Sequence, residues 1–163
     1  MYKSILTIIC ITVMGMSLNA QNKNATKTLQ KHHVGIHASS LGGVGFSYRY
    51  WPGKLGVQIT TLPIFRQNKG YFLSVGATAL YTLKEGKTVD LYSYIGTHYI
   101  GENYSGNQQD NGSSSLNTGL GVGFKINLSE FLNLNIQTGY GFYNITESLS
   151  TTIAGGAGLY YSF

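Results

Sequence analysis

LNTGLGVGFKINL, residues 116–128, places leucine, threonine, valine, phenylalanine or isoleucine at every even position. The odd positions hold asparagine, glycine and lysine. Such a period of two predicts a β-strand with one apolar face. The opposite face carries Gly119, Gly121 and Gly123, and glycine inside a strand usually marks a close approach or tight curvature. The stretch is therefore expected to lie in a strongly curved sheet.

The same alternation recurs along the chain from residue 33 to the C-terminus. It predicts seven further strands, at about 33–39, 43–51, 54–64, 73–83, 89–99, 132–142 and 149–163, making eight in all. Short turns are expected at 51–54, 84–87 and 128–130, and longer loops at 66–70, 102–115 and 144–148. This order indicates an antiparallel up-and-down meander. The first connector, near 41–43, is shorter than the pattern requires, which leaves open one bulged strand over 34–50.

The composition indicates which solvent the apolar faces meet. Only 10% of the 163 residues are charged, whereas about a quarter is usual for a soluble domain. The second face of each strand is mostly glycine, asparagine, serine, threonine and glutamine, so it does not form a typical hydrated surface. A narrow barrel with a polar interior and a lipid-facing apolar exterior fits both observations. Aromatic residues at the strand ends, Trp51 among them, are expected to form two interfacial bands.

The N-terminus has the features of an export signal. Lys3 precedes an apolar run over 5–13, and small residues lead up to Ala20, after which cleavage is expected. The chain then divides into a signal peptide (1–20), a polar periplasmic segment (21–32) and a barrel domain (33–163). The single cysteine, Cys10, lies inside the signal, so no disulfide is expected in the exported protein. The net charge is +5 for the whole sequence and about +4 once Lys3 leaves with the signal, and without a clustered basic face it argues against nucleic-acid binding.

The C-terminus carries a family resemblance. Leu159, Tyr161 and Phe163 alternate and end the chain on phenylalanine. This pattern, with the signal peptide and the eight strands, resembles the small OmpA/OmpX-like outer-membrane β-barrel proteins of Gram-negative bacteria. The resemblance implies a monomer in outer-membrane lipid, with periplasmic termini, whose last strand is recognised by the barrel-assembly machinery. The loop at 102–115 would then face outwards and offer the best surface for an external partner.

Three charged residues are expected inside the barrel. Asp90 and Lys125 face inwards near the periplasmic turns of neighbouring antiparallel strands, so the spacing predicts a cross-strand ion pair. Arg49, near the same end, is expected to join them across the lumen. Because an eight-stranded barrel is barely wide enough for its own side chains, we interpret this cluster as a plug rather than a gate.

Some eight-stranded outer-membrane barrels that resemble this chain are lipid A acyl-transfer enzymes, so a catalytic site is a second possibility. Closure of the barrel is expected to bring Ser150 and Thr152 near inward-facing His37, with Glu147 in the adjoining loop. No motif frames these residues. Adjacent His32 and His33 point to opposite faces of a strand, so neither a metal site nor a cofactor is expected.

The sequence thus favours a non-enzymatic outer-membrane barrel with a structural or surface-contact role. Two alternatives remain open at this point. One is an outer-membrane lipid acyl-chain enzyme that uses His37. The other is a soluble periplasmic β-barrel that binds a small apolar ligand.

Overall fold

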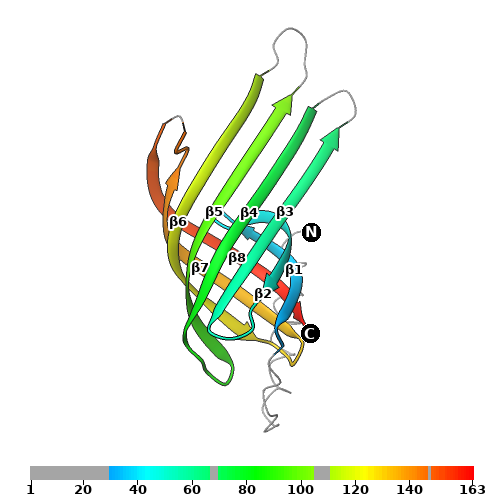
Figure 1. Ribbon diagram of the computed structural model, residues 1–163, viewed down its shortest axis with the longest axis vertical. Helices are drawn as coiled ribbons and strands as arrows, with labels where there is room; N and C mark the ends of the chain where they lie inside the picture. Colours follow the sequence, from blue (N-terminus) through cyan, green and yellow to red (C-terminus); the bar gives the residue numbers. More distant parts are fainter. Residues whose placement is uncertain (1–29, 67–69, 105–110, 147) are drawn as a thin grey trace, which may run out of the picture.

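The computed structural model describes residues 30–66, 70–104, 111–146 and 148–163. These residues form eight strands in one closed antiparallel barrel, in which each strand pairs with its chain neighbours and β8 pairs with β1 (Figure 1). The strands are β1 (His32–Ser39), β2 (Gly43–Tyr50), β3 (Leu55–Arg66), β4 (Gly70–Lys84), β5 (Val89–Tyr104), β6 (Asn111–Asn127), β7 (Leu132–Tyr143) and β8 (Ser150–Ser162). The predicted up-and-down barrel is confirmed.

None of the described residues forms a helix that is long and apolar enough to cross a membrane.

The predicted separation of β1 and β2 is confirmed, because the chain turns at residues 40–42 and Gly43 takes a positive φ of 85°. One bulged strand over 34–50 is therefore excluded. The predicted loop at 102–115 is wrong over most of its length, since Glu102 pairs with Ser113 and Asn103 with Gly112. Alternation identifies a strand only where one face is apolar, and this part of the hairpin is polar on both faces. Residues 105–110 lie outside the described chain.

The wall of the barrel is uneven in height. β1 and β2 have eight residues each, whereas β5 has 16 and β6 has 17. The β2–β3 ladder ends at the pair Phe46–Thr61, while the β3–β4 ladder continues to the end of β3. Strands β3 to β6 therefore rise well above the β1–β2 hairpin (Figure 1).

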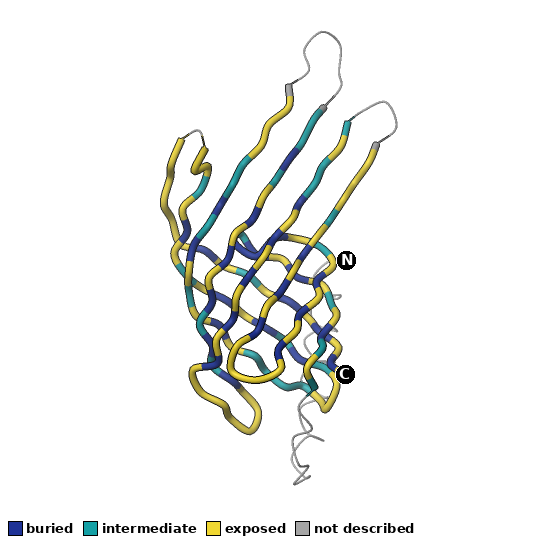
Figure 2. The backbone as a smooth tube through the Cα atoms, viewed as in Figure 1, coloured by how far each residue is buried: buried dark blue, intermediate teal, exposed yellow. Residues whose placement is uncertain are grey.

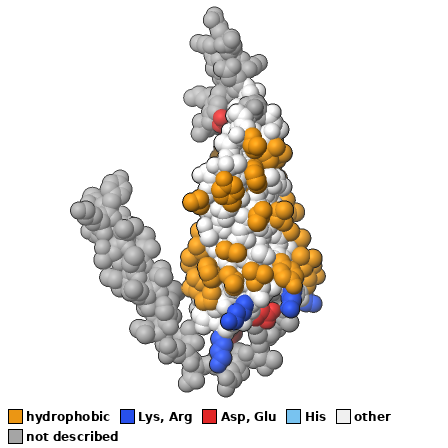
Figure 3. Space-filling view, turned by 90° about the vertical axis from the view of Figure 1, so that its left-hand side faces the viewer, with side chains coloured by type: hydrophobic (Ala, Val, Ile, Leu, Met, Phe, Trp, Pro, Cys, Tyr) orange, Lys and Arg blue, Asp and Glu red, His pale blue; other side chains and the backbone are white. Residues whose placement is uncertain are grey.

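The two faces of each strand meet different surroundings. On β6 the apolar residues point outwards, with Leu120 60% and Phe124 45% exposed. Polar residues such as Gln58 and Thr60 are buried inside, so burial alternates along the strands (Figure 2). Hydrophobic side chains cover much of the outer surface on the face shown in Figure 3. A continuous apolar exterior is suited to lipid and not to water, which contradicts the alternative of a soluble barrel with an apolar core.

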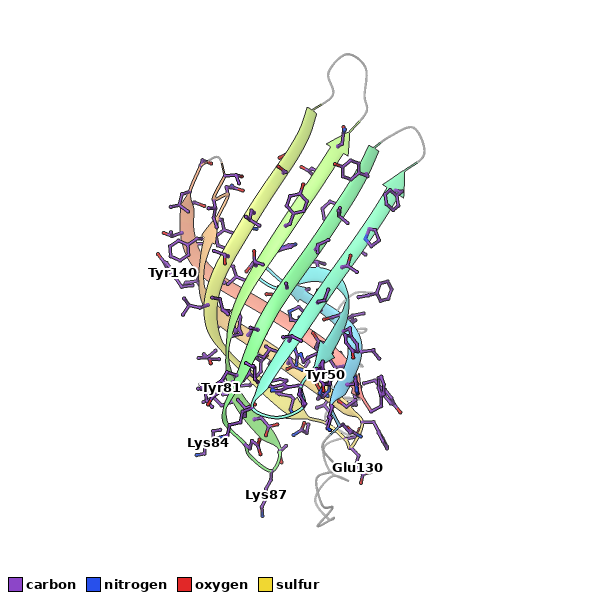
Figure 4. All side chains as sticks on the ribbon, viewed as in Figure 1. Tyr50, Tyr81, Lys84, Lys87, Glu130 and Tyr140 are labelled. Atoms are coloured by element: carbon purple, nitrogen blue, oxygen red, sulfur yellow. The ribbon has the colours of Figure 1, made fainter. Side chains whose placement is uncertain are left out.

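Charged and aromatic residues mark the lower edge of this surface. Lys84, Lys87 and Glu130 lie at the short turns, and Tyr50 and Tyr81 lie just above them (Figure 4). Tyr140 stands near the opposite end of the wall (Figure 4). Aromatic residues at both edges of an apolar band are typical of membrane barrels. The exception is Trp51, which is only 5% exposed and points into the barrel.

Candidate functional site: a lumen closed at two levels

Arg49 is the centre of the lower layer inside the barrel. It stands on β2 with an inward-facing, fully buried side chain. Its Nε and Nη2 donate to Gln58 Oε1 at 3.1 and 2.6 Å, and its Nη1 donates to Asn135 Oδ1 at 2.7 Å. The guanidinium carbon lies 4.2 Å from the centroid of the Tyr160 ring. Hydrogen bonds from one side chain thus connect β2 to β3 and β7, and the cation–π contact with Tyr160 connects β2 to β8.

Asp90 and Lys125 face each other on β5 and β6. They are direct cross-strand partners, and Lys125 Nζ lies 2.9 Å from Asp90 Oδ2. This is the cross-strand contact that the sequence spacing predicts. Asp90 Oδ1 also accepts a hydrogen bond of 3.0 Å from the backbone N–H of Gly86, which fixes the β4–β5 turn to the floor of the barrel.

Trp51 joins these two groups of charges. Its ring centroid lies 5.4 Å from Arg49 Cζ and 5.2 Å from Lys125 Nζ, and the ring meets Tyr92 edge-on. The expectation that Trp51 belongs to the interfacial band is therefore wrong. Gly56 on β3 makes room for the indole, because a Cβ there would lie 2.6 Å from Trp51 Cγ. A cation–π contact on each side holds the ring in the lumen.

A chain of polar contacts continues from Arg49 to the closing seam between β8 and β1. Asn135 Nδ2 donates to Asn133 Oδ1 at 2.9 Å, and Asn133 Nδ2 donates to Ser162 Oγ at 2.6 Å. His33 Nδ1 bonds the same hydroxyl at 2.6 Å and is 4% exposed. His33 is thus buried in the lower layer of the lumen.

The β1–β2 turn closes the lumen at a higher level. Leu41 has no exposed surface, and its two Cδ atoms lie where side chains at Gly119 and Gly141 would otherwise extend. Ser40 O accepts a hydrogen bond of 3.2 Å from His98 Nδ1. Ser40 Oγ accepts one of 2.9 Å from the Tyr143 hydroxyl. The first connector is thus a short turn that points into the barrel and packs across it.

Two tyrosines add bulk on the inner face between β5 and β7. Tyr92 is completely buried and Tyr94 is 4% exposed. Tyr92 lies against Gly123. Tyr94 lies against Gly121, where a Cβ would be 2.8 Å from Tyr94 Cε1. Gly121 and Gly123 therefore leave space for the large side chains of their cross-strand partners on the neighbouring strand β5.

The predicted catalytic group does not assemble. In the β1–β8 ladder His37 lies opposite Gly158, whereas Ser150 pairs with Tyr143 at the far end of β8. Eight strand residues separate Ser150 from Gly158, which corresponds to about 26 Å. The expectation matched the outer ends of β1 and β8, but β1 ends opposite Gly156. Glu147 lies outside the described residues.

His37 is itself an inward, buried side chain. It is 3% exposed, and its ring centroid lies 6.1 Å from that of Tyr160. Across the described ranges, no three or more histidine, cysteine, aspartate or glutamate residues come together as a metal site would require.

The C-terminal residues close the barrel. Leu159, Tyr161 and Phe163 all present exposed side chains to the exterior. The backbone N–H of Phe163 donates to His32 O at 2.9 Å, and its ring stacks on that of His32 with centroids 5.7 Å apart. The residues of the predicted assembly signal thus also fasten β8 to β1.

The sequence and the barrel fold were compared with those of known proteins. Neither a known family nor a curated protein matches the sequence. Among solved structures, the N-terminal β-barrel domain of Pseudomonas aeruginosa OprF matches with a TM-score of 0.54 and 13% identity, over 81% of this chain and 95% of that domain. The fold is that of the small outer-membrane β-barrels.

Two further structures share this outer-membrane barrel fold. Neisserial surface protein A matches with a TM-score of 0.52 and 18% identity, over 82% of this chain and 97% of that protein. Ail, the attachment invasion locus protein of Yersinia pestis, was solved with the heparin analogue sucrose octasulfate. It matches with a TM-score of 0.50 and 18% identity, over 81% of this chain and 96% of that one.

Proposed function

We propose that the protein is an integral outer-membrane barrel of a Gram-negative bacterium, without enzymatic activity, whose lumen is closed to solutes. Its role is structural or one of surface contact. The observation that carries this proposal is the double closure of the lumen, by the Arg49 layer below and the inward β1–β2 turn above. The side chains inside the barrel contact one another, and on this proposal they leave no channel. Such a barrel is suited to hold its outer end rigidly in the membrane.

The proposed contact surface is the outer half of the β5–β6 hairpin. Beyond the pair Tyr99–Leu116 most residues of its strands are serine, asparagine, glycine or glutamate, which suit water better than lipid. At the other end, Leu159, Tyr161 and Phe163 are proposed to be recognised by the barrel-assembly machinery after export and cleavage behind Ala20. We propose that the protein works as a monomer.

Conductance measurements in planar lipid bilayers test the closed lumen. The folded protein should produce no stable channel, and a heat-dependent shift on a gel verifies that the inserted material is folded. The Asp90→Asn variant should also remain closed, because Arg49 and Leu41 still fill the lumen. A large, stable conductance from either protein would contradict the plug.

A further inference from the structure

The wall of the barrel has a notch above the β1–β2 hairpin. The last pairs of the hairpin with its neighbours are Phe46–Thr61 on the β3 side and Ser39–Gly156 on the β8 side. Beyond them, the outer parts of β3 and β8 have no strand between them within the described chain. Phe65 on β3 and Ile153 on β8 are 81% and 77% exposed at this height. Apolar side chains on both flanks indicate that the notch opens into lipid and not above it.

A cavity of about 480 Å³ lies on the lumen side of this notch. Its floor is the inward turn, and its inner walls include Ile100 of β5, Asn117 of β6 and Tyr143 of β7. Ala38 and Val44, which point outwards from β1 and β2, line it as well. The cavity therefore extends from the upper lumen through the wall to the exterior.

A second cavity of about 480 Å³ lies on the outer surface over β8, β1, β2 and β3. Ile36, Phe46, Leu62 and Leu159 are among its lining residues. It shares Ala38 and Val44 with the first cavity, so the two lie next to each other at these residues. One lies along the lipid-facing wall, and the other lies above the hairpin at the upper lumen.

Most polar atoms along the first cavity already have hydrogen-bond partners within the protein. Both ring nitrogens of His98 are bonded, to Ser40 O and Ser74 Oγ. Ser39 Oγ accepts from the N–H groups of the turn, and Asn117 Oδ1 accepts from Asn144 N at 3.1 Å. No lysine or arginine is among the described residues that line either cavity. The linings thus offer mainly hydrocarbon contact, and His98 and His37 are their only basic side chains among the described residues.

We propose that the notch is a lateral binding site for one acyl chain of an outer-leaflet membrane lipid, which enters over Ala38 and Val44 and reaches Ile100 and Tyr143. Each cavity has the volume of an ordinary small-ligand site. Burial of the chain end would remove apolar surface of Ile100 and of the Tyr143 ring from contact with water in the upper lumen. The site depends on the membrane location proposed above.

Photo-crosslinking in vesicles tests this site. The full protein is folded into phosphatidylcholine vesicles that contain a small fraction of a phospholipid with a diazirine near the end of one acyl chain. After irradiation, mass spectrometry should find adducts on lumen-facing Ile100 and Tyr143 as well as on exterior residues. In Ala38→Phe, which fills the junction of the two cavities, the lumen adducts should fall several-fold.

The matched control is Ala79→Phe, which adds the same ring to a lipid-facing alanine on β4, and its lumen adducts should be unchanged. Folding of each variant is checked by the heat-dependent gel shift. Adducts on exterior residues alone, or equal lumen adducts in Ala38→Phe and Ala79→Phe, would overturn the lateral site and leave the membrane location standing. A folded protein without adducts on either face would overturn both.

Discussion

Arg49 has no exposed surface. Its burial is tolerated because each of its three guanidinium nitrogens has a hydrogen-bond acceptor. Two of its nitrogens share Gln58 Oε1 and a third meets Asn135 Oδ1. A buried guanidinium without such partners would be strongly destabilising. The aromatic faces of Tyr160 and Trp51 complete its surroundings. Its role in this barrel is to connect strands that lie on opposite sides of the lumen.

Asp90→Asn should destabilise the lower layer without opening it. The change removes the charge opposite Lys125 and weakens the acceptor of the Gly86 N–H. We expect a loss of about 1–3 kcal/mol in the free energy of unfolding. Urea titration in lipid vesicles measures it, and the fluorescence of Trp51 reports on the affected layer directly. Unchanged stability would show that the pair contributes nothing to the plug.

Gly123→Ala should destabilise the barrel because its methyl group would meet the ring of Tyr92. Overpacking of this kind costs about 1–3 kcal/mol. Gly112→Ala is the matched control on the same strand, since the nearest atom to its Cβ would be Glu102 O at 3.9 Å. The two variants are compared by their urea midpoints. Equal midpoints would contradict a packing role for the glycine-lined face.

Part of this lower layer is predictable from sequence. Asp90 and Lys125 could be paired because both lie a fixed distance from short turns, and turns set the register of a meander. The amide partners Gln58 and Asn135 were not singled out, because polar residues are abundant on every inner face. The prediction for Trp51 is wrong because a tryptophan beside a turn has the same sequence context whether it lies in the interfacial band or in the lumen.

At the scale of elements, the β1–β2 hairpin decides how the barrel is closed. The turn packs across the lumen against the glycines of β6 and β7, and Ser40 is tied to His98 and Tyr143. From sequence, the connector was recognised as short, but its inward direction was not foreseen. Direction depends on contacts with strands far along the chain, and alternation within one segment carries no information about them.

Leu41→Ala should destabilise the hairpin by leaving a cavity between the turn and the wall. A buried leucine replaced by alanine loses about 2–5 kcal/mol. Protection of the Leu41 and Gly42 amides against hydrogen exchange should fall in the variant, because these groups bond Ser39 Oγ within the turn. Protection within β5 should change little. Native exchange rates in the turn of the variant would contradict the packed position of Leu41.

Phe163→Ala should affect assembly in cells more than stability. The side chain is 56% exposed and its backbone bonds to His32 remain possible in the variant. We therefore expect normal heat-shifted protein after refolding in detergent, but several-fold less in the outer-membrane fraction of cells. Equal losses in both experiments would assign Phe163 to closing the barrel alone.

For the whole molecule, the strand count, the antiparallel order and the direction of the apolar faces all follow from alternation and composition. What the sequence does not reveal is the uneven wall. The polar upper half of β5–β6 has no alternation, and the short β1–β2 hairpin was expected to match its neighbours. The predicted contact between His37 and Ser150 is absent for the same reason. It required the outer ends of β1 and β8 to lie at equal height.

The lipid-facing exterior and the filled lumen are tested together by tryptophan quenching with brominated lipids. Trp51 is the only tryptophan of the chain and is buried in the lumen. In vesicles of phosphatidylcholine with brominated acyl chains, Trp51 of the native protein should be quenched weakly. A Phe124→Trp variant in a Trp51→Phe background, with its single tryptophan on the outer face of β6, should be quenched strongly. Strong quenching of Trp51 with weak quenching at position 124 would contradict the barrel described.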